Sequence, residues 1–83
     1  MGRNEIIHRV NDFLIEEFEL EENSLRSEAH LVDDLGIESL DFVDIVVTIE
    51  KEFNFKVKRE EIIRVHTLND LYSYIEERTL STQ

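Results

Sequence analysis

Apolar residues near the start of the chain recur at steps of three and four, and charged residues fill most positions between them. These apolar residues are Ile6, Ile7, Val10, Phe13, Leu14 and Phe18. The spacing puts them on one side of an α-helix and predicts an amphipathic helix over residues 3–18. Over residues 19–38 no period is visible, and leucines are scattered among polar and acidic residues. We predict a long connection here, which its leucines tack to the core.

Residues 40–53 contain many β-branched side chains, which also suit a strand. The polar positions decide between the two, because they fall at steps of three and four, whereas a half-buried strand alternates by two. These positions are Asp41, Asp44, Thr48, Lys51 and Glu52. We therefore predict a helix that is apolar over more than half of its circumference and heavily buried. Ser39 stands where it can cap this helix, and Gly36 gives flexibility to the loop before it.

The last third of the chain predicts a short helix and a final long one. The charged residues 58–64 favour one or two helical turns. The apolar anchors of this short helix are Ile62, Ile63 and Val65. Thr67 and Asp70 form a capping pair for the final helix, which is predicted to end near Glu77. Its apolar stripe consists of Leu68, Leu71, Tyr72 and Ile75.

Together these elements predict an all-α fold: a small four-helix bundle with three main helices, one short helix and a long first loop. A chain of 83 residues has the size of one small domain. We therefore predict a single domain over residues 1–83. Its core extends from about residue 3 to residue 77, and residues 78–83 are expected to form a frayed tail.

The balance of charge narrows the classes of partner. The chain has 20 Asp and Glu against 9 Lys and Arg, which gives a formal net charge of −11. Nucleic-acid backbones and anionic lipids repel carboxylates. We therefore expect no nucleic-acid partner, no membrane insertion, and partner proteins with basic surfaces.

The absence of cysteine and the spacing of the histidines exclude several kinds of catalytic and metal-binding site. The chain has no Cys, which rules out disulfides, a thiolate nucleophile and Cys-based metal sites, and which suits a cytoplasmic protein. His8, His30 and His66 are far apart in the sequence and lack the spacing of a metal site. We expect no bound metal and predict that the three imidazoles face solvent.

One stretch of the chain, around Ser39, indicates a candidate functional site. Residues 33–41 read Asp-Asp-Leu-Gly-Ile-Glu-Ser-Leu-Asp. They present the hydroxyl of Ser39 at the first turn of a helix, where the dipole and the free N–H groups favour an anion such as a phosphate ester. A catalytic serine needs a base, and none is nearby in the sequence; the stretch also lacks the Gly-x-Ser-x-Gly elbow of hydrolases. We therefore expect that the protein is not an enzyme.

This stretch resembles the attachment motif of acyl carrier proteins, whose common form is Asp-Ser-Leu, often preceded by Leu-Gly and followed by Asp or Glu. The resemblance extends over about residues 5–77. It implies that Ser39 carries 4'-phosphopantetheine, attached from coenzyme A by a separate phosphopantetheinyl transferase. It also implies that acids at the motif are held by partner enzymes. The acids in question are Glu38, Asp41, Asp44 and Glu50.

The resemblance further implies a cavity between the helices that shelters the acyl chain. The residues at the bordering positions are Phe42, Ile49, Val57, Val65 and Leu71. The chain departs from the family pattern in several places, among them Phe42, where smaller residues are common, and Lys51, which interrupts an acidic run. Glu38 replaces the more usual aspartate, and a basic cluster stands where the family often has acids and a proline. That cluster is Lys56, Lys58 and Arg59.

The resemblance thus implies a freestanding, monomeric carrier that holds acyl intermediates as thioesters during fatty-acid or polyketide/polyene-type biosynthesis. Its partners would be acyl-loading, condensing and reducing enzymes with basic docking patches. The departures favour a specialised pathway. Two alternatives stay open: a peptidyl or aminoacyl carrier, which shares the fold and the arm, and an acidic helical interaction module without prosthetic group, in which Ser39 is only a helix cap.

Overall fold

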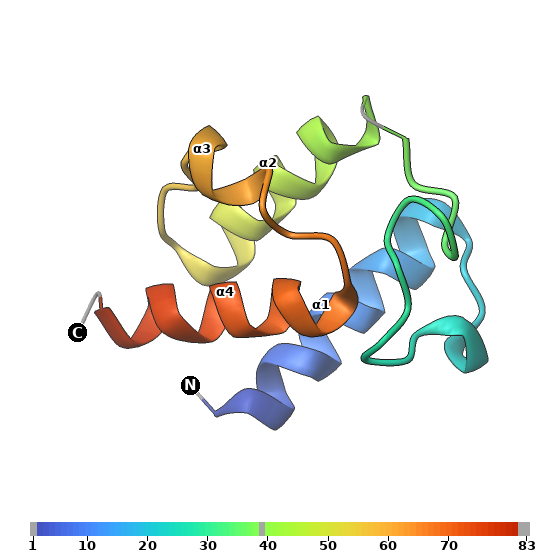
Figure 1. The fold of residues 1–83 in the computed structure, drawn as a ribbon. Coiled ribbons are helices and arrows are strands. Elements are labelled where there is room, and N and C mark those ends of the chain that lie inside the picture. The colour runs from blue at the N-terminus through green and yellow to red at the C-terminus, as the bar shows by residue number, and fades with distance from the viewer. Residues whose placement is uncertain (1, 39, 82–83) are drawn as a thin grey trace.

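The computed structural model of the chain describes residues 2–38 and 40–81 and confirms the predicted all-α bundle (Figure 1). Its elements are α1 (Arg3–Phe18), the 3₁₀ helix η1 (Glu22–Ser24), α2 (Asp41–Phe53), α3 (Arg59–Ile62) and α4 (Leu68–Ser81). Helices α1 and α4 pack against each other, and α2 with the short α3 lies above α4 in the view of Figure 1. Among the described residues, no helix combines the length and the hydropathy needed to cross a membrane.

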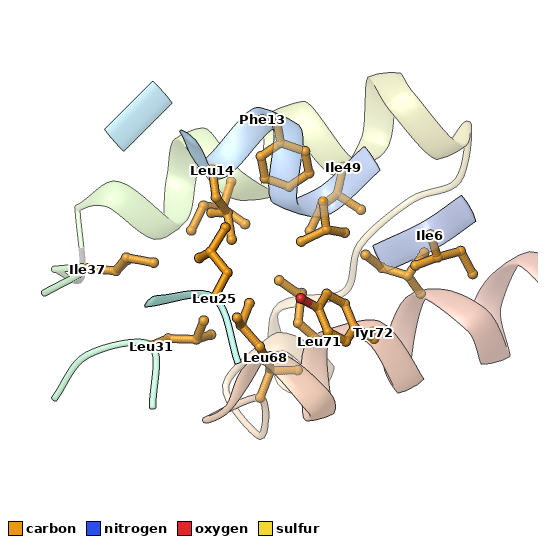
Figure 2. Close-up of a cluster of buried hydrophobic side chains, with 14 of the residues drawn as sticks. Ile6, Phe13, Leu14, Leu25, Leu31, Ile37, Ile49, Leu68, Leu71 and Tyr72 are labelled. Atoms are coloured by element: carbon orange, nitrogen blue, oxygen red, sulfur yellow. The ribbon is translucent and has the colours of Figure 1, made fainter. Parts of the chain in front are cut away.

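One hydrophobic core joins the helices to the long first loop. Its largest fully buried side chains come from α1, α2, α4 and this loop. Figure 2 shows labelled side chains from all four segments pointing into the same interior. They include Ile6, Leu14, Leu31, Ile37, Ile49, Leu68, Leu71 and Tyr72. Because burial of one such aliphatic side chain contributes about 1.5–3 kcal/mol, this core is the main source of the bundle's stability.

The long first loop is fastened to the core, as the scattered leucines predict. Its buried side chains are Leu25, Ala29, Leu31, Leu35 and Ile37. The loop also pairs with the backbone that leads into α4: the N–H of Leu31 donates to the carbonyl of His66 at 2.8 Å, and the N–H of Leu68 donates to that of Ala29 at 3.0 Å. These contacts satisfy backbone groups that would otherwise be buried without partners, so the loop has a defined path.

Helix α4 begins with the predicted capping pair. The N–H of Asp70 donates to Thr67 Oγ1 at 3.1 Å, and the N–H of Thr67 donates to Asp70 Oδ2 at 3.1 Å. Partial burial raises the pKa of the Asp70 carboxyl, but the hydrogen bonds from His66 and Thr67 outweigh it and hold this pKa below its ordinary value. The capping pair is therefore strongest with Asp70 ionised.

Helix α2 begins one residue after its predicted start. Its first residue is Asp41, and the N-cap position is taken by Leu40, which offers no side-chain cap. The predicted cap, Ser39, lies outside the described residues. The loop before the helix turns at Gly36, whose φ of 71° is in the left-handed region that favours glycine.

Helix α4 continues to Ser81 instead of ending near Glu77. Arg78 explains the extension, because it reaches back to the segment before α3. Its guanidinium donates to the carbonyl of Lys56 at 3.1 Å and lies 5.5 Å from the centre of the Phe55 ring. Residues 78–81 are therefore helical where the sequence predicted fraying.

Candidate functional site

The serine motif lies where the long first loop enters α2, in the green part of the ribbon (Figure 1). Ser39, the predicted attachment residue, lies outside the described residues, so its two neighbours define the place. Glu38 and Leu40 are both exposed, Leu40 to 81%. Ile37 is 1% exposed and anchors the loop in the core. The residues on both sides of position 39 are thus exposed, and the loop that leads to them is anchored in the core at Ile37.

Three of the four predicted partner-binding acids gather at the start of α2. Asp41 and Asp44 are three residues apart in its first turn, where negative charge is favoured by the helix dipole. Asp41 Oδ2 accepts the N–H of Glu38 at 3.0 Å. Glu50 lies in the second half of the helix, and its Oε2 accepts the N–H of Val57 at 2.9 Å. The structure thus gives Glu50 a role in holding the connection between α2 and α3.

A cavity of about 670 Å³ lies next to α2, between this helix, α3 and the segments on either side of them. From α2 its lining takes Phe42, Val43, Val46 and Val47. From the chain after α2 it takes Val57, Ile62, Ile63 and Val65. The polar residues at the cavity are His30, Arg59 and His66, and Val32 of the long loop completes it. The arrangement provides a mainly apolar space next to the helix that the serine motif begins.

The structure brings together three of the five residues predicted to border an acyl cavity. Phe42, Val57 and Val65 line this cavity, whereas Ile49 and Leu71 do not. Both of these are 0% exposed and belong to the core between the long helices. Ile49 lies four residues from Phe53 and from Ile45, which are also buried. This stripe faces the core rather than the cavity.

Helix α2 is less buried than its pattern predicts, because Val43 is 62% and Val47 is 43% exposed. Ile63, a predicted anchor, is 65% exposed at the end of α3, while its neighbour Ile62 is buried. Helix α3 has only four residues and cannot cover the whole apolar side of α2. The sequence signal for this open face was present: α2 is apolar over a wider arc than one buried stripe needs.

The sequence analysis missed a pair of histidines at the cavity. The rings of His30 and His66 stack with their centroids 6.0 Å apart, and the side chain of His30 is 35% exposed. His8, at 77% exposure, and His66 are exposed, as predicted, whereas His30 is partly buried. The pairing depends on the backbone bridge between His30 and Thr67, which no local sequence pattern predicts. Among the described residues, no group of three or more metal-ligating side chains is present.

One wall of the cavity is held in place by a polar network between α3 and α4. Glu61 Oε1 accepts the hydroxyl of Tyr74 at 2.9 Å and lies 3.6 Å from the guanidinium of Arg78. Burial raises the pKa of the Tyr74 phenol, and its hydrogen bond to Glu61 raises it further. Since the neutral phenol is the donor, Glu61 joins the short α3 to the long α4.

Comparison with known proteins finds matches that cover most of the chain. A family model described as "Phosphopantetheine attachment site" matches residues 8–75. An acyl carrier protein of Thermotoga maritima is 40% identical over 77 residues, covering 93% of this chain and 95% of the relative. An acyl carrier protein of Bdellovibrio bacteriovorus is 33% identical over 70 residues, covering 84% of this chain and 90% of the relative.

Proposed function

Because this chain belongs to the acyl carrier proteins, we propose that it holds acyl groups as thioesters on a 4'-phosphopantetheine arm attached to Ser39. Acyl carrier proteins have no catalytic activity of their own, and a phosphopantetheinyl transferase modifies them. When bound, 4'-phosphopantetheine supplies the thiol of the thioester. The observation that carries the proposal is the Leu-Gly-Ile-Glu-Ser-Leu-Asp run at an exposed helix start, inside a family match that covers most of the chain.

The surroundings of Ser39 support this assignment. Ile37 is buried and α2 starts at Asp41, so both ends of the motif are fixed while Glu38 and Leu40 remain exposed. A transferase can therefore approach the serine without unfolding the bundle. The hydroxyl of Ser39 acts as a nucleophile once, toward coenzyme A, and the transferase supplies the catalysis.

The acids at the start of α2 are proposed to guide basic partner enzymes. Glu38 and Asp44 are exposed, and Asp41 lies between them on the same turn. Charges at the rim of an interface act mainly on the association rate and lose their influence as salt rises. Glu50 is a weaker candidate, because its carboxylate is already engaged by the backbone of Val57.

The cavity beside α2 is proposed to shelter the acyl chain. Its lining is mainly Val and Ile, and Phe42 at its edge is only partly buried. The proposed setting is a cytoplasmic monomer serving fatty-acid or polyketide/polyene-type synthesis. The names of the relatives support acyl cargo over amino-acid cargo, and the family match supports a prosthetic group over a bare interaction module.

Intact-mass measurement after incubation with a phosphopantetheinyl transferase and coenzyme A tests the proposal. The wild type and the control Ser27→Ala are expected to gain the mass of the arm, and Ser39→Ala is expected to gain none. Asp44→Lys is expected to load more slowly at low salt than the control Asp12→Lys, which makes the same change of charge on α1. Modification that persists in Ser39→Ala would contradict the assignment.

A further inference from the structure

The chain is strongly acidic, yet the one Lys, Arg, Asp or Glu among the described residues that line the cavity is a cation, Arg59. Acids outnumber bases by 20 to 9 in the sequence, yet no carboxylate is among the described residues that line the cavity. The polar side chains there are those of Arg59, His30 and His66. A guanidinium is only a hydrogen-bond donor, and a neutral imidazole always has one N–H to donate. The cavity therefore offers apolar walls and donors, which suits a ligand that is mostly apolar and carries an acceptor or an anion.

Arg59 differs from most other arginines of the chain in that it has no carboxylate partner among the described residues. Arg3, Arg9 and Arg78 each lie within 4.0 Å of a carboxylate oxygen, as does Arg26 of the first loop. Within residues 2–38 and 40–81, the guanidinium of Arg59 has no such ion pair. Its charge is therefore available to a ligand in the cavity.

His30 adds a second hydrogen-bond donor to the lining of the cavity. Its Nδ1 accepts the N–H of Asp33 at 3.2 Å. In the neutral ring the proton then resides on Nε2, which leaves Nε2–H as the donor. His66, stacked against His30, lines the same cavity.

Arg59 lies toward the end of the cavity that is farther from the start of α2. The N–H of Val57 is bonded to Glu50, which places the segment that enters α3 beside the second half of α2. Residue 39 lies before the first turn of the same helix. At 1.5 Å per residue, Glu50 is about 14 Å along the axis from the first turn. A chain that enters from the serine end meets Phe42 and Val43 first and the region of Arg59 later.

We propose that the cavity accommodates an acyl chain whose far end carries a carboxylate, and that Arg59 is its ion-pair partner. This inference rests on the proposed function, because the chain must be tethered at Ser39. The planar guanidinium matches a carboxylate in geometry and charge. The valines beside it contact the methylene groups, and the N–H of His30 is a further donor at the cavity. The preferred cargo is therefore a dicarboxylic acyl group rather than a methyl-ended one.

The test compares three cargoes that differ at the far end of the chain. The apo protein is loaded by a phosphopantetheinyl transferase with the coenzyme A thioesters of adipic acid, of monomethyl adipate and of hexanoic acid, and each product is checked by mass. Melting temperatures are then measured at low salt for wild type, Arg59→Gln and Arg64→Gln. Arg64 is the matched control, because it is an exposed arginine that lines a different depression of the surface.

In wild type and in Arg64→Gln, the adipoyl form is expected to melt about 2–5 °C above the monomethyl adipoyl form, as an exposed ion pair allows. In Arg59→Gln the difference is expected to vanish. Equal melting temperatures in wild type, or an undiminished difference in Arg59→Gln, would overturn the proposal. The proposal would also be overturned if Arg59→Gln already changed the melting temperature of the protein that carries the arm without an acyl group, because Arg59 would then bind the arm itself. Failure to load any of the three thioesters contradicts the proposed function itself.

Discussion

Helices α1 and α4 enclose their apolar side chains, whereas α2 and α3 leave several of theirs open. Leu80, near the end of α4, is the one large apolar side chain of α1 and α4 that is exposed among the described residues. On the other side Val43, Val47 and Ile63 are all exposed and line one cavity. Both sides have the same kind of apolar pattern, so the difference lies in what covers it.

The closed side is covered by a long partner helix and locked by polar contacts. Arg3 of α1 donates to Asn69 Oδ1 of α4 at 2.6 Å and lies 3.3 Å from Glu76. The hydroxyl of Tyr72 donates to Asn11 across the same interface. The open side has only the four residues of α3, which Glu61 joins to α4. The fold is therefore stabilised on one side, and the apolar residues of the other side are available for a ligand.

An Ile→Ala substitution on each side tests this division between a closed and an open side, and it should give the largest effect on the free energy of unfolding. Ile75→Ala removes a side chain that is 0% exposed in α4 and is expected to lower the free energy of unfolding by about 2–5 kcal/mol. Ile63→Ala removes one that is 65% exposed and is expected to change it by less than about 0.5 kcal/mol. Urea denaturation followed by circular dichroism measures both. Similar losses for the two variants would contradict the division.

The helices were predictable because their signals are local. The spacing of Ile6, Val10 and Leu14 predicts α1 without any knowledge of the rest of the chain, and the polar positions of α2 distinguish a helix from a strand. The cap of α4 follows from Thr67 and Asp70 alone. The contacts of a helix repeat at a fixed spacing along the chain, so the apolar positions are periodic and can be recognised in a single sequence.

The cavity was predictable only in part, because its walls come from distant segments. His30 and His66 meet through a backbone bridge that depends on the path of the long loop. Ile49 and Leu71 are apolar like the true lining, and the pattern alone does not tell which apolar stripe faces the core. The length of α4 depends on the contact of Arg78 with Phe55, which also has no local signal.

The second prediction compares the starts of α4 and α2; among the described residues, a side-chain cap is present only at the start of α4. Asp70→Asn is expected to lower the free energy of unfolding by about 0.5–2 kcal/mol at neutral pH. Because the pKa of Asp70 is lowered on folding, its contribution is fully present above its ordinary value of 3.8. The contribution is lost as the pH falls through the lowered pKa. Asp44→Asn, in the first turn of α2, is expected to lower the free energy of unfolding by less, because Asp44 forms no such capping pair in the described residues.

Denaturation of wild type and both variants at neutral pH and near pH 3 measures this dependence. The gap between wild type and Asp70→Asn is expected to shrink on acidification. A gap that stays constant with pH would show that the charge of Asp70 does not strengthen the cap.

The smallest expected effect is on the melting temperature, and it comes from the different distributions of charge in residues 12–22 and around α3. Residues 12–22, which end α1 and begin the long loop, contain six acids and no base. Around α3, by contrast, Lys56, Lys58 and Arg59 adjoin Glu60 and Glu61. Self-repulsion in the acidic stretch is screened by salt, so the melting temperature is expected to rise by about 2–4 °C from low to physiological ionic strength. Millimolar divalent cations are expected to raise it as well.

The double variant Glu16→Gln and Glu17→Gln removes two exposed charges of that stretch and should raise the melting temperature at low salt while reducing the response to salt. Glu60→Gln is the matched control, because it removes a charge that has cations beside it. We expect no gain in melting temperature from this control. If Glu60→Gln stabilises the protein as much as the double variant does, repulsion depends on total charge alone, and the contrast between the acidic stretch and the α3 region has no effect on stability.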